Sequence, residues 1–211
     1  MKKRIFNLII LDESGSMASI SKAAVDSINE SLQSIRHAQR KFEEQEHFVT
    51  FVTFNDDTRI LFDRAPIGLV NDVCMESYNP SCCTALYDAM GDSINRLRKY
   101  VTPEDNVLVT IITDGYENAS REYRGADIKS LVESMKKEGW VFAYIGANQD
   151  VEAVGASLSI GNTLSFEATV TGTGKMSRRM SESRDRLFCS MACNDFCAES
   201  ANESFFADDE E

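Results

Sequence analysis

The residues best suited to chemistry are Asp12, Ser14 and Ser16, which stand two positions apart in the chain. They follow directly on the apolar run Ile5–Leu11. A short apolar run that ends at a polar, glycine-containing turn is typical of a buried strand leading into a loop. In open α/β sheets, ligands bind beyond the carboxyl ends of the strands. The sequence therefore predicts one carboxylate and two hydroxyls together at the edge of the sheet where binding takes place.

Two later residues carry the same kind of oxygen. Thr84 stands at the head of a helical pattern, and Asp114 follows a second apolar run, Val107–Thr113. Carboxylate and hydroxyl oxygens are hard ligands, which suit Mg²⁺, Mn²⁺ or Ca²⁺ better than zinc or copper. We expect Mg²⁺ or Mn²⁺, and Ca²⁺ less, because an all-oxygen set with two carboxylates suits an octahedral shell.

Taken in order, five residues resemble the metal-ion-dependent adhesion site (MIDAS) of the von Willebrand factor type A (vWA) domain family: Asp12, Ser14, Ser16, Thr84 and Asp114. The family pattern is Asp-x-Ser-x-Ser, then a single Thr, then an Asp after a hydrophobic strand. Three pieces in the right order and context are far more specific than any one of them. The resemblance covers about residues 4–170.

The resemblance implies a protein–protein interaction module without catalysis, such as an adaptor or assembly factor. In the family, hydroxyls hold the ion directly and the aspartates often act through water, so much of the charge of the ion stays unquenched. An unidentified partner protein would then supply an Asp or Glu carboxylate to complete the coordination. Bacterial members of the family that work with ATPases, stress-resistance or modification systems provide the analogy, which rests on the fold alone.

Apolar runs and helical spacings alternate along the rest of the chain. Turn residues separate the runs 47–54 and 59–62 at hairpin distance, so the second run should be an antiparallel edge strand. The alternation predicts an α/β fold, Rossmann-like and doubly wound, with a mainly parallel sheet, one antiparallel edge strand and helices on both faces. The other predicted elements are helices at 19–44, 86–101, 128–135 and 150–157 and strands at 5–11, 107–113, 140–145 and 163–166.

The chain is predicted to have two parts, a vWA domain over residues 1–170 and a C-terminal part over residues 171–211. The C-terminal part begins as a linker, because Thr169–Lys175 is rich in threonine and glycine. A helical extension is expected over residues 176–206, although its hydrophobic periodicity is poor. The last residues, Ala207–Glu211, form an acidic tail.

The formal net charge of the 211-residue chain is −12. This acidity argues against binding to nucleic acid or to anionic membranes, whose protein partners are usually basic. No apolar run approaches the ~20 residues that cross a bilayer, and without an export signal the expected location is the cytoplasm.

In the cytoplasm, the six cysteines should be reduced thiols in the core. Cys189, Cys193 and Cys197 are expected to pack against the sheet as one helical stripe.

The alternative function is a Mg²⁺-dependent hydrolase or phosphotransferase. Such an enzyme needs a general base or a nucleophile beside the ion, and only Asp12 and Asp114 are candidates. A phosphatase of the haloacid dehalogenase type also needs an acid two residues after its first aspartate, where this chain has Ser14. The sequence therefore favours binding over catalysis.

Four acidic or amide residues near the motif have expected roles of their own. Glu13 should be exposed and influence the choice of partner. Asp88 lies one helical turn after Thr84 and should tie down a loop by hydrogen bonding rather than touch the metal. Glu117 and Asn118 belong either to the rim of the recognition face or to a solvated loop.

Overall fold

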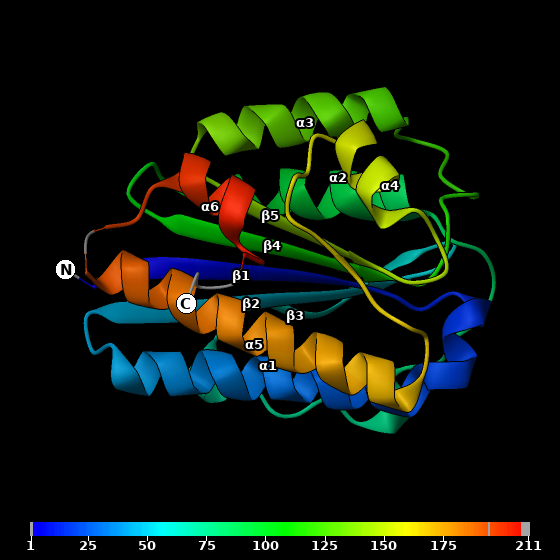
Figure 1. The fold of residues 1–211 in the computed structure, drawn as a ribbon, viewed down its shortest axis with the longest axis horizontal. Coiled ribbons are helices and arrows are strands. Elements are labelled where there is room, and N and C mark those ends of the chain that lie inside the picture. Colours follow the sequence, from blue (N-terminus) through cyan, green and yellow to red (C-terminus); the bar gives the residue numbers. More distant parts are fainter. Residues whose placement is uncertain (1, 194, 208–211) are drawn as a thin grey trace.

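The centre of the molecule is a six-stranded sheet in the order β3-β2-β1-β4-β5-β6 (Figure 1). The computed structural model describes residues 2–193 and 195–207. β3 pairs antiparallel with β2, and the other neighbouring strands are parallel, which confirms the predicted fold class. The strands are β1 (Lys3–Asp12), β2 (Gln45–Phe54), β3 (Thr58–Pro66), β4 (Asn106–Thr113), β5 (Val141–Gly146) and β6 (Thr163–Ser165).

Helices cover both faces of the sheet, as predicted (Figure 1). On one face, α1 (Ser21–Lys41) and α5 (Val170–Ala192) lie side by side. The opposite face carries α2 (Leu86–Leu97), α3 (Gly125–Lys137) and α4 (Val151–Ser157), while α6 (Ala198–Ser204) contacts β5 and α3. Each face buries its own apolar core, which a mainly parallel sheet requires. The short 3-10 helices are η1 (Gly15–Ile20), η2 (Ile67–Leu69) and η3 (Met75–Ser77).

The central position of β1 explains where the predicted chemistry lies. Every residue from Ile5 to Asp12 is buried, because helices cover the strand on both faces. β1 runs between β2 and β4, and Leu11 pairs with Ile112 across the sheet. Asp12 and Thr113 therefore leave the sheet next to each other, at the carboxyl ends of its two central strands.

Helix boundaries differ from the sequence prediction by a few residues. The helix expected at 19–44 is the α-helix Ser21–Lys41, preceded by the 3-10 turn of η1. The helix expected to reach residue 101 ends at Leu97. The hydrophobic spacing thus locates both helices, and local turns decide their ends.

The linker predicted at Thr169–Lys175 is wrong, because helix α5 begins at Val170. Thr169 is the N-cap of this helix, and its side chain accepts a hydrogen bond from the backbone N–H of Gly172 at 3.0 Å. Gly172 also packs tightly, since a Cβ on it would lie 2.2 Å from the carbonyl oxygen of Glu167. Capping and close packing thus explain why the start of this helix has a composition that is typical of loops.

Helix α5 belongs to the same apolar core as α1. Met176, Met180 and Phe188 are buried there against the sheet. The helical prediction for residues 176–206 is confirmed in part, by α5 and by α6. The division of the chain after residue 170 remains a prediction, and residues 208–211 of the acidic tail lie outside the described residues.

Two asparagines cover the part of β5 that the short strand β6 leaves unpaired. Asn202 accepts a hydrogen bond from the backbone N–H of Phe142 at 3.1 Å and donates one to the carbonyl of Trp140 at 2.9 Å. Asn162 donates to the carbonyl of Phe142 at 3.0 Å. These amides replace a neighbouring strand, and they connect α6 to the sheet.

The prediction that the cysteines lie in the core is wrong. All six are free thiols, and all six are exposed. Cys189 lies on the outer surface of α5, Cys193 is its C-cap and Cys197 follows the helix, so the expected stripe does not face the sheet. Helical spacing alone identifies a common side of the helix, but it does not say whether that side faces the core.

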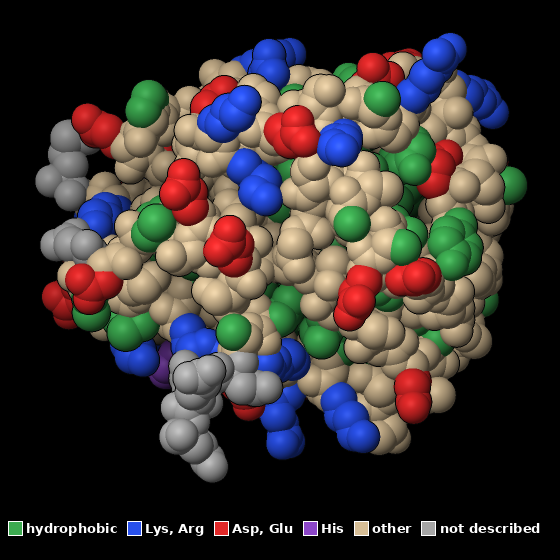
Figure 2. Space-filling model, turned by 45° about the horizontal axis from the view of Figure 1, so that its top comes forward, with side chains coloured by type: hydrophobic (Ala, Val, Ile, Leu, Met, Phe, Trp, Pro, Cys, Tyr) green, Lys and Arg blue, Asp and Glu red, His purple; other side chains and the backbone are tan. Residues whose placement is uncertain are grey.

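The surface carries mixed charge. On the face drawn in Figure 2, Lys and Arg side chains alternate with Asp and Glu side chains, and hydrophobic side chains appear mostly as separate spots. Among the described residues, no helix combines the length and the apolar character needed to cross a membrane. The cytoplasmic location stays a prediction.

Candidate metal site

Side chains from three separate segments meet beyond the carboxyl ends of β1 and β4. The Oγ atoms of Ser14 and Ser16 lie 3.1 Å apart, and Ser16 Oγ donates a hydrogen bond to Asp114 Oδ1 at 2.5 Å. The hydroxyl of Thr84 lies near that of Ser16, because both are close to Gly115. A Cβ atom added to this glycine would lie 3.4 Å from Thr84 Oγ1 and 3.8 Å from Ser16 Oγ. The three hydroxyls and one carboxylate singled out from the sequence are thus close together.

Asp12 lies behind these hydroxyls and is fully buried. Its Oδ1 accepts a hydrogen bond from the backbone N–H of Ser14 at 2.7 Å, and its Oδ2 accepts one from Thr113 Oγ1 at 2.6 Å. Both oxygens of Asp12 are therefore held in place. Thr113 is a site residue that the sequence pattern does not reveal, because its role depends on the register between β1 and β4.

Burial changes the acidity of both aspartates. It raises the pKa of Asp12 above the usual value, while hydrogen bonds from Thr113 and Ser14 act in the opposite direction. Burial also raises the pKa of Asp114, against the hydrogen bond from Ser16. The ionised form of each carboxylate is thus held at an energetic cost that a neighbouring cation would offset.

The donor set fits a small, hard divalent cation. Adjacent oxygens of an octahedral Mg²⁺ shell with bonds near 2.1 Å are about 3.0 Å apart, which matches the 3.1 Å between Ser14 Oγ and Ser16 Oγ. Because Ser16 donates its proton to Asp114, Ser14 must be the donor in the bond between the two serines, which leaves one lone pair of Ser16 Oγ for a cation. Within the described residues, no three His, Cys, Asp or Glu side chains form a metal-binding group. An ion at this point would therefore depend on the hydroxyls.

Carboxylates hold the loops around the site. Asp88 accepts hydrogen bonds from the backbone N–H groups of residues 121–123 at 2.7–3.0 Å, which confirms its predicted role as a loop anchor. Glu117 accepts hydrogen bonds from the backbone N–H groups of residues 87, 119 and 120. Its carboxylate therefore connects the loop after β4 to the start of α2.

Asn118 positions the threonine of the site. Its Oδ1 accepts a hydrogen bond from the backbone N–H of Thr84 at 2.9 Å, and its own backbone N–H donates to the carbonyl of Thr84 at 3.0 Å. Glu117 and Asn118 therefore bind neighbouring backbone, a role that neither interpretation of them as rim or solvated loop included.

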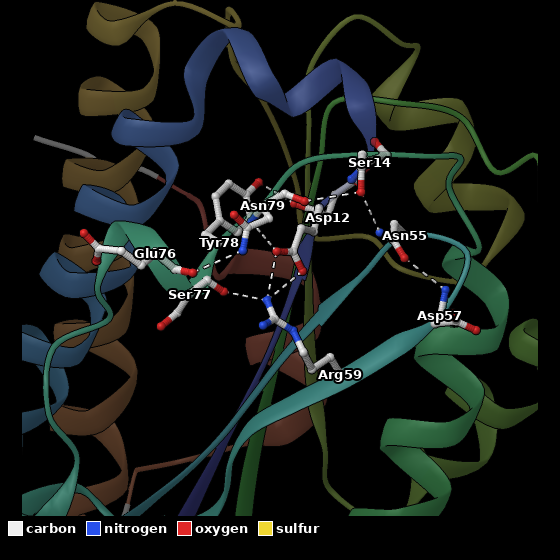
Figure 3. A network of polar contacts seen from close by, with 11 residues as sticks. Asp12, Ser14, Asn55, Asp57, Arg59, Glu76, Ser77, Tyr78 and Asn79 are labelled. Atoms are coloured by element: carbon white, nitrogen blue, oxygen red, sulfur yellow. Dashed lines mark hydrogen bonds and ion pairs between the residues drawn. The ribbon is translucent and has the colours of Figure 1, made fainter.

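Glu13 is the clearest departure from expectation. Its side chain was expected to be exposed, but the residue is only 5% exposed. Its carboxylate accepts hydrogen bonds from Arg59 Nη2 at 2.9 and 3.0 Å and from the backbone N–H of Asn79 at 2.5 Å. In Figure 3, Arg59 points from β3 toward Ser77. A glutamate between two candidate ligands thus binds a neighbouring loop instead of facing solvent.

Fold and site together define a class of protein, an α/β domain with a cluster of hydroxyls and carboxylates at the carboxyl ends of its central strands. No protein-family model matches the sequence, and no curated protein matches it. Solved structures, however, show that the chain has the fold of the vWA domain.

Three of these structures illustrate the likeness. A von Willebrand factor type A protein from Catenulispora acidiphila matches with a TM-score of 0.60 and 14% identity, over 86% of this chain and 42% of that one. The ArnB paralog VWA2 from Sulfolobus acidocaldarius matches with a TM-score of 0.56 and 18% identity, over 87% of this chain and 45% of that one. Proximal thread matrix protein 1 of the mussel byssus matches with a TM-score of 0.58 and 15% identity, over 87% of this chain and 46% of that one. That structure is described as having a zinc-occupied MIDAS motif. The chain thus spans less than half the length of each.

Proposed function

We propose that this protein is a divalent-metal-dependent protein–protein interaction module. The ion would be Mg²⁺ or Mn²⁺, held by the hydroxyls of Ser14, Ser16 and Thr84, with Asp12 and Asp114 fixing those ligands from behind. The observation that carries the proposal is the contact between Ser14 Oγ, Ser16 Oγ and Asp114 Oδ1, next to Thr84 and at the carboxyl ends of the central strands.

The ligand types imply what kind of partner would bind. Hydroxyls add no charge, so an ion held by them keeps much of its double positive charge and favours an anionic ligand. An Asp or Glu side chain of a partner protein would supply that ligand. The role would be that of an adaptor or assembly factor, in which the ion forms the contact.

The alternative, a Mg²⁺-dependent hydrolase or phosphotransferase, has less support. It needs a general base or nucleophile within reach of the ion. The two histidines of the chain lie elsewhere: His37 is exposed on α1, and His47 is buried on β2 among residues of the core below α5. Asp12 and Asp114 already accept hydrogen bonds from the other site residues, which favours a role in holding ligands.

Removing both serine hydroxyls tests the metal site. In Ser14→Ala/Ser16→Ala, we expect Mg²⁺ affinity to fall at least about tenfold, because the substitutions remove two of the three hydroxyls of the proposed ligand set. Isothermal titration calorimetry measures the change. Ser130→Ala/Ser204→Ala is the matched control, since these exposed hydroxyls bond only carbonyls of their own helices. Unchanged affinity in the Ser14 and Ser16 variant would contradict the assignment.

Partner binding should depend on the same ion. Immobilised protein is expected to retain a partner from lysate in Mg²⁺ and to release it on addition of a chelator. Thr84→Ala should weaken retention in Mg²⁺, because the threonine hydroxyl belongs to the ligand set. A partner that stays bound both after chelation and in Thr84→Ala would show that the interface lies elsewhere on the domain.

A further inference from the structure

We propose that Glu13 and Arg59 form a clamp that positions Thr84 and makes the metal site selective for Mg²⁺ over the larger Ca²⁺. The clamp consists of the Glu13 carboxylate, the Arg59 guanidinium and the loop backbone at Ser77 and Asn79. The inference rests on the proposed metal binding and assigns Glu13 and Arg59 as positioning residues. Neither is a ligand of the ion.

The contacts of Glu13 show that its carboxylate is not available as a metal ligand. Arg59 Nη2 contacts both of its oxygens, and the backbone N–H of Asn79 also donates to Oε1. Arg59 Nη2 donates in addition to the carbonyl of Ser77 at 2.5 Å. One buried carboxylate, placed between Asp12 and Ser14 in the chain, thus connects the metal motif to β3 and to the loop after η3.

This loop depends on the metal motif for its position. Tyr78 is buried, but residues 79–83 are exposed or half-buried, so they have little core of their own. Besides the clamp, three hydrogen bonds attach the loop to the motif: Tyr78 Oη to the carbonyl of Asp12 at 2.6 Å, the N–H of Ser81 to the carbonyl of Glu13 at 2.9 Å, and the N–H of Gly15 to the carbonyl of Cys82 at 3.2 Å.

Thr84 ends this loop and is held from three sides. The turn between β2 and β3 holds both chain neighbours of Thr84, because their backbone N–H groups donate to Asp56 Oδ1 at 3.0 Å and to the carbonyl of Asn55 at 2.8 Å. Asn118 bonds its backbone on the β4 side. On the β1 side, the clamp and the loop it holds determine how far Thr84 lies from Ser14 and Ser16. Without the clamp, we expect the loop to loosen and this distance to vary.

A variable distance between these hydroxyls should lower the affinity for Mg²⁺ more than the affinity for Ca²⁺. Mg²⁺ requires near-ideal octahedral geometry with bonds of about 2.0–2.1 Å, whereas Ca²⁺ accepts six to eight oxygens at about 2.3–2.6 Å in flexible arrangements. A rigid spacing of the three hydroxyls therefore favours the smaller ion. A loosened loop keeps the same ligands but loses that preference.

The test compares Mg²⁺ and Ca²⁺ affinities, measured by calorimetry, in wild type, Glu13→Ala and Glu13→Gln/Arg59→Met. The double variant removes both charges and keeps an acceptor for the N–H of Asn79, which protects folding. We expect Mg²⁺ affinity to fall at least about tenfold, the usual lower limit for residues that orient ligands, and Ca²⁺ affinity to change much less. Lys22→Ala/Asp26→Ala, which removes an exposed ion pair on α1, should leave both affinities unchanged.

The outcomes separate this inference from the proposed function. If wild type binds neither ion, the proposed function is wrong, and the proposed role of the clamp is wrong with it. If wild type binds Mg²⁺ and both Glu13 variants keep its affinity, the clamp alone is wrong. If the affinities for Mg²⁺ and Ca²⁺ fall by the same factor, Glu13 has only a general structural role. That result would contradict the proposal that the clamp makes the site selective for Mg²⁺.

Discussion

Acidification from pH 7.5 to pH 4.5 is expected to destabilise this protein through one buried histidine. Burial, and secondarily the charge of Arg184, lower the pKa of His47 from 6.5 to about 4. In the unfolded chain the imidazole takes up a proton below pH 6.5, whereas in the folded protein it stays neutral until about pH 4. The unfolded state therefore binds more protons in this window, and stability falls as the pH falls.

The size of the effect follows from the shift in pKa. Between pH 7.5 and pH 4.5, the lowered pKa takes effect over about 2 pH units, from pH 6.5 down to pH 4.5, and these correspond to about 2.5 kcal/mol. Urea unfolding of wild type and His47→Gln at both pH values measures it, because titrations of other groups largely cancel in the comparison. The difference in unfolding free energy between pH 7.5 and pH 4.5 should be smaller in His47→Gln by about this amount.

The exposed His37 provides a matched control for the loss of a histidine. His37→Gln should show the pH dependence of wild type. An equal pH dependence in wild type and His47→Gln would mean that His47 has the same pKa in the folded and the unfolded protein, against the lowered pKa.

The sequence is sufficient to predict those features that depend on local patterns. Apolar runs such as Ile5–Leu11 locate central strands, because a strand covered on both faces must be apolar at nearly every position. The turn before β3 predicts an antiparallel edge strand. The chemistry of Asp12, Ser14 and Ser16 is visible because these residues follow such a strand directly.

Features that depend on contacts between distant segments are not visible in the same way. Thr113 binds Asp12 only because β1 and β4 are in register, and Glu13 is buried only because Arg59 and the loop after η3 reach it. The amide pair of Asn162 and Asn202 likewise replaces a strand that does not reach the end of β5. Each of these roles requires the position of a partner at least 20 residues away.

Helix α5 shows a local pattern that misleads. Its first residues are threonine and glycine, and its polar residues include Arg184 among the positions that face the core. Arg184 is 1% exposed, and its Nε and Nη1 atoms have no hydrogen-bond partner among the described residues. Burial lowers the pKa of this arginine to about 10. A helix that buries a guanidinium, here with two nitrogens lacking a hydrogen-bond partner, has weak hydrophobic periodicity, which is why its sequence does not resemble a core helix.

Replacing Arg184 with methionine is therefore expected to stabilise the protein by about 2 kcal/mol. Each buried donor without a partner costs about 1–3 kcal/mol, and exchanging buried charge for apolar groups of similar volume is often stabilising. Methionine retains the apolar stem that packs between Met180 and Phe188 on the same face of α5. Urea unfolding at pH 7.5 measures the change, and Arg184→Gln, which keeps a polar group in the core, is the matched control.

The same substitution should act on His47, because the positive charge of Arg184 contributes to the lowered pKa of that histidine. Without this charge the pKa of His47 rises part of the way toward its usual value. The loss of stability between pH 7.5 and pH 4.5 should then be smaller in Arg184→Met than in wild type. A destabilised Arg184→Met would show that the guanidinium has favourable partners in the core, such as buried water between it and the unpaired Nδ1 of His47.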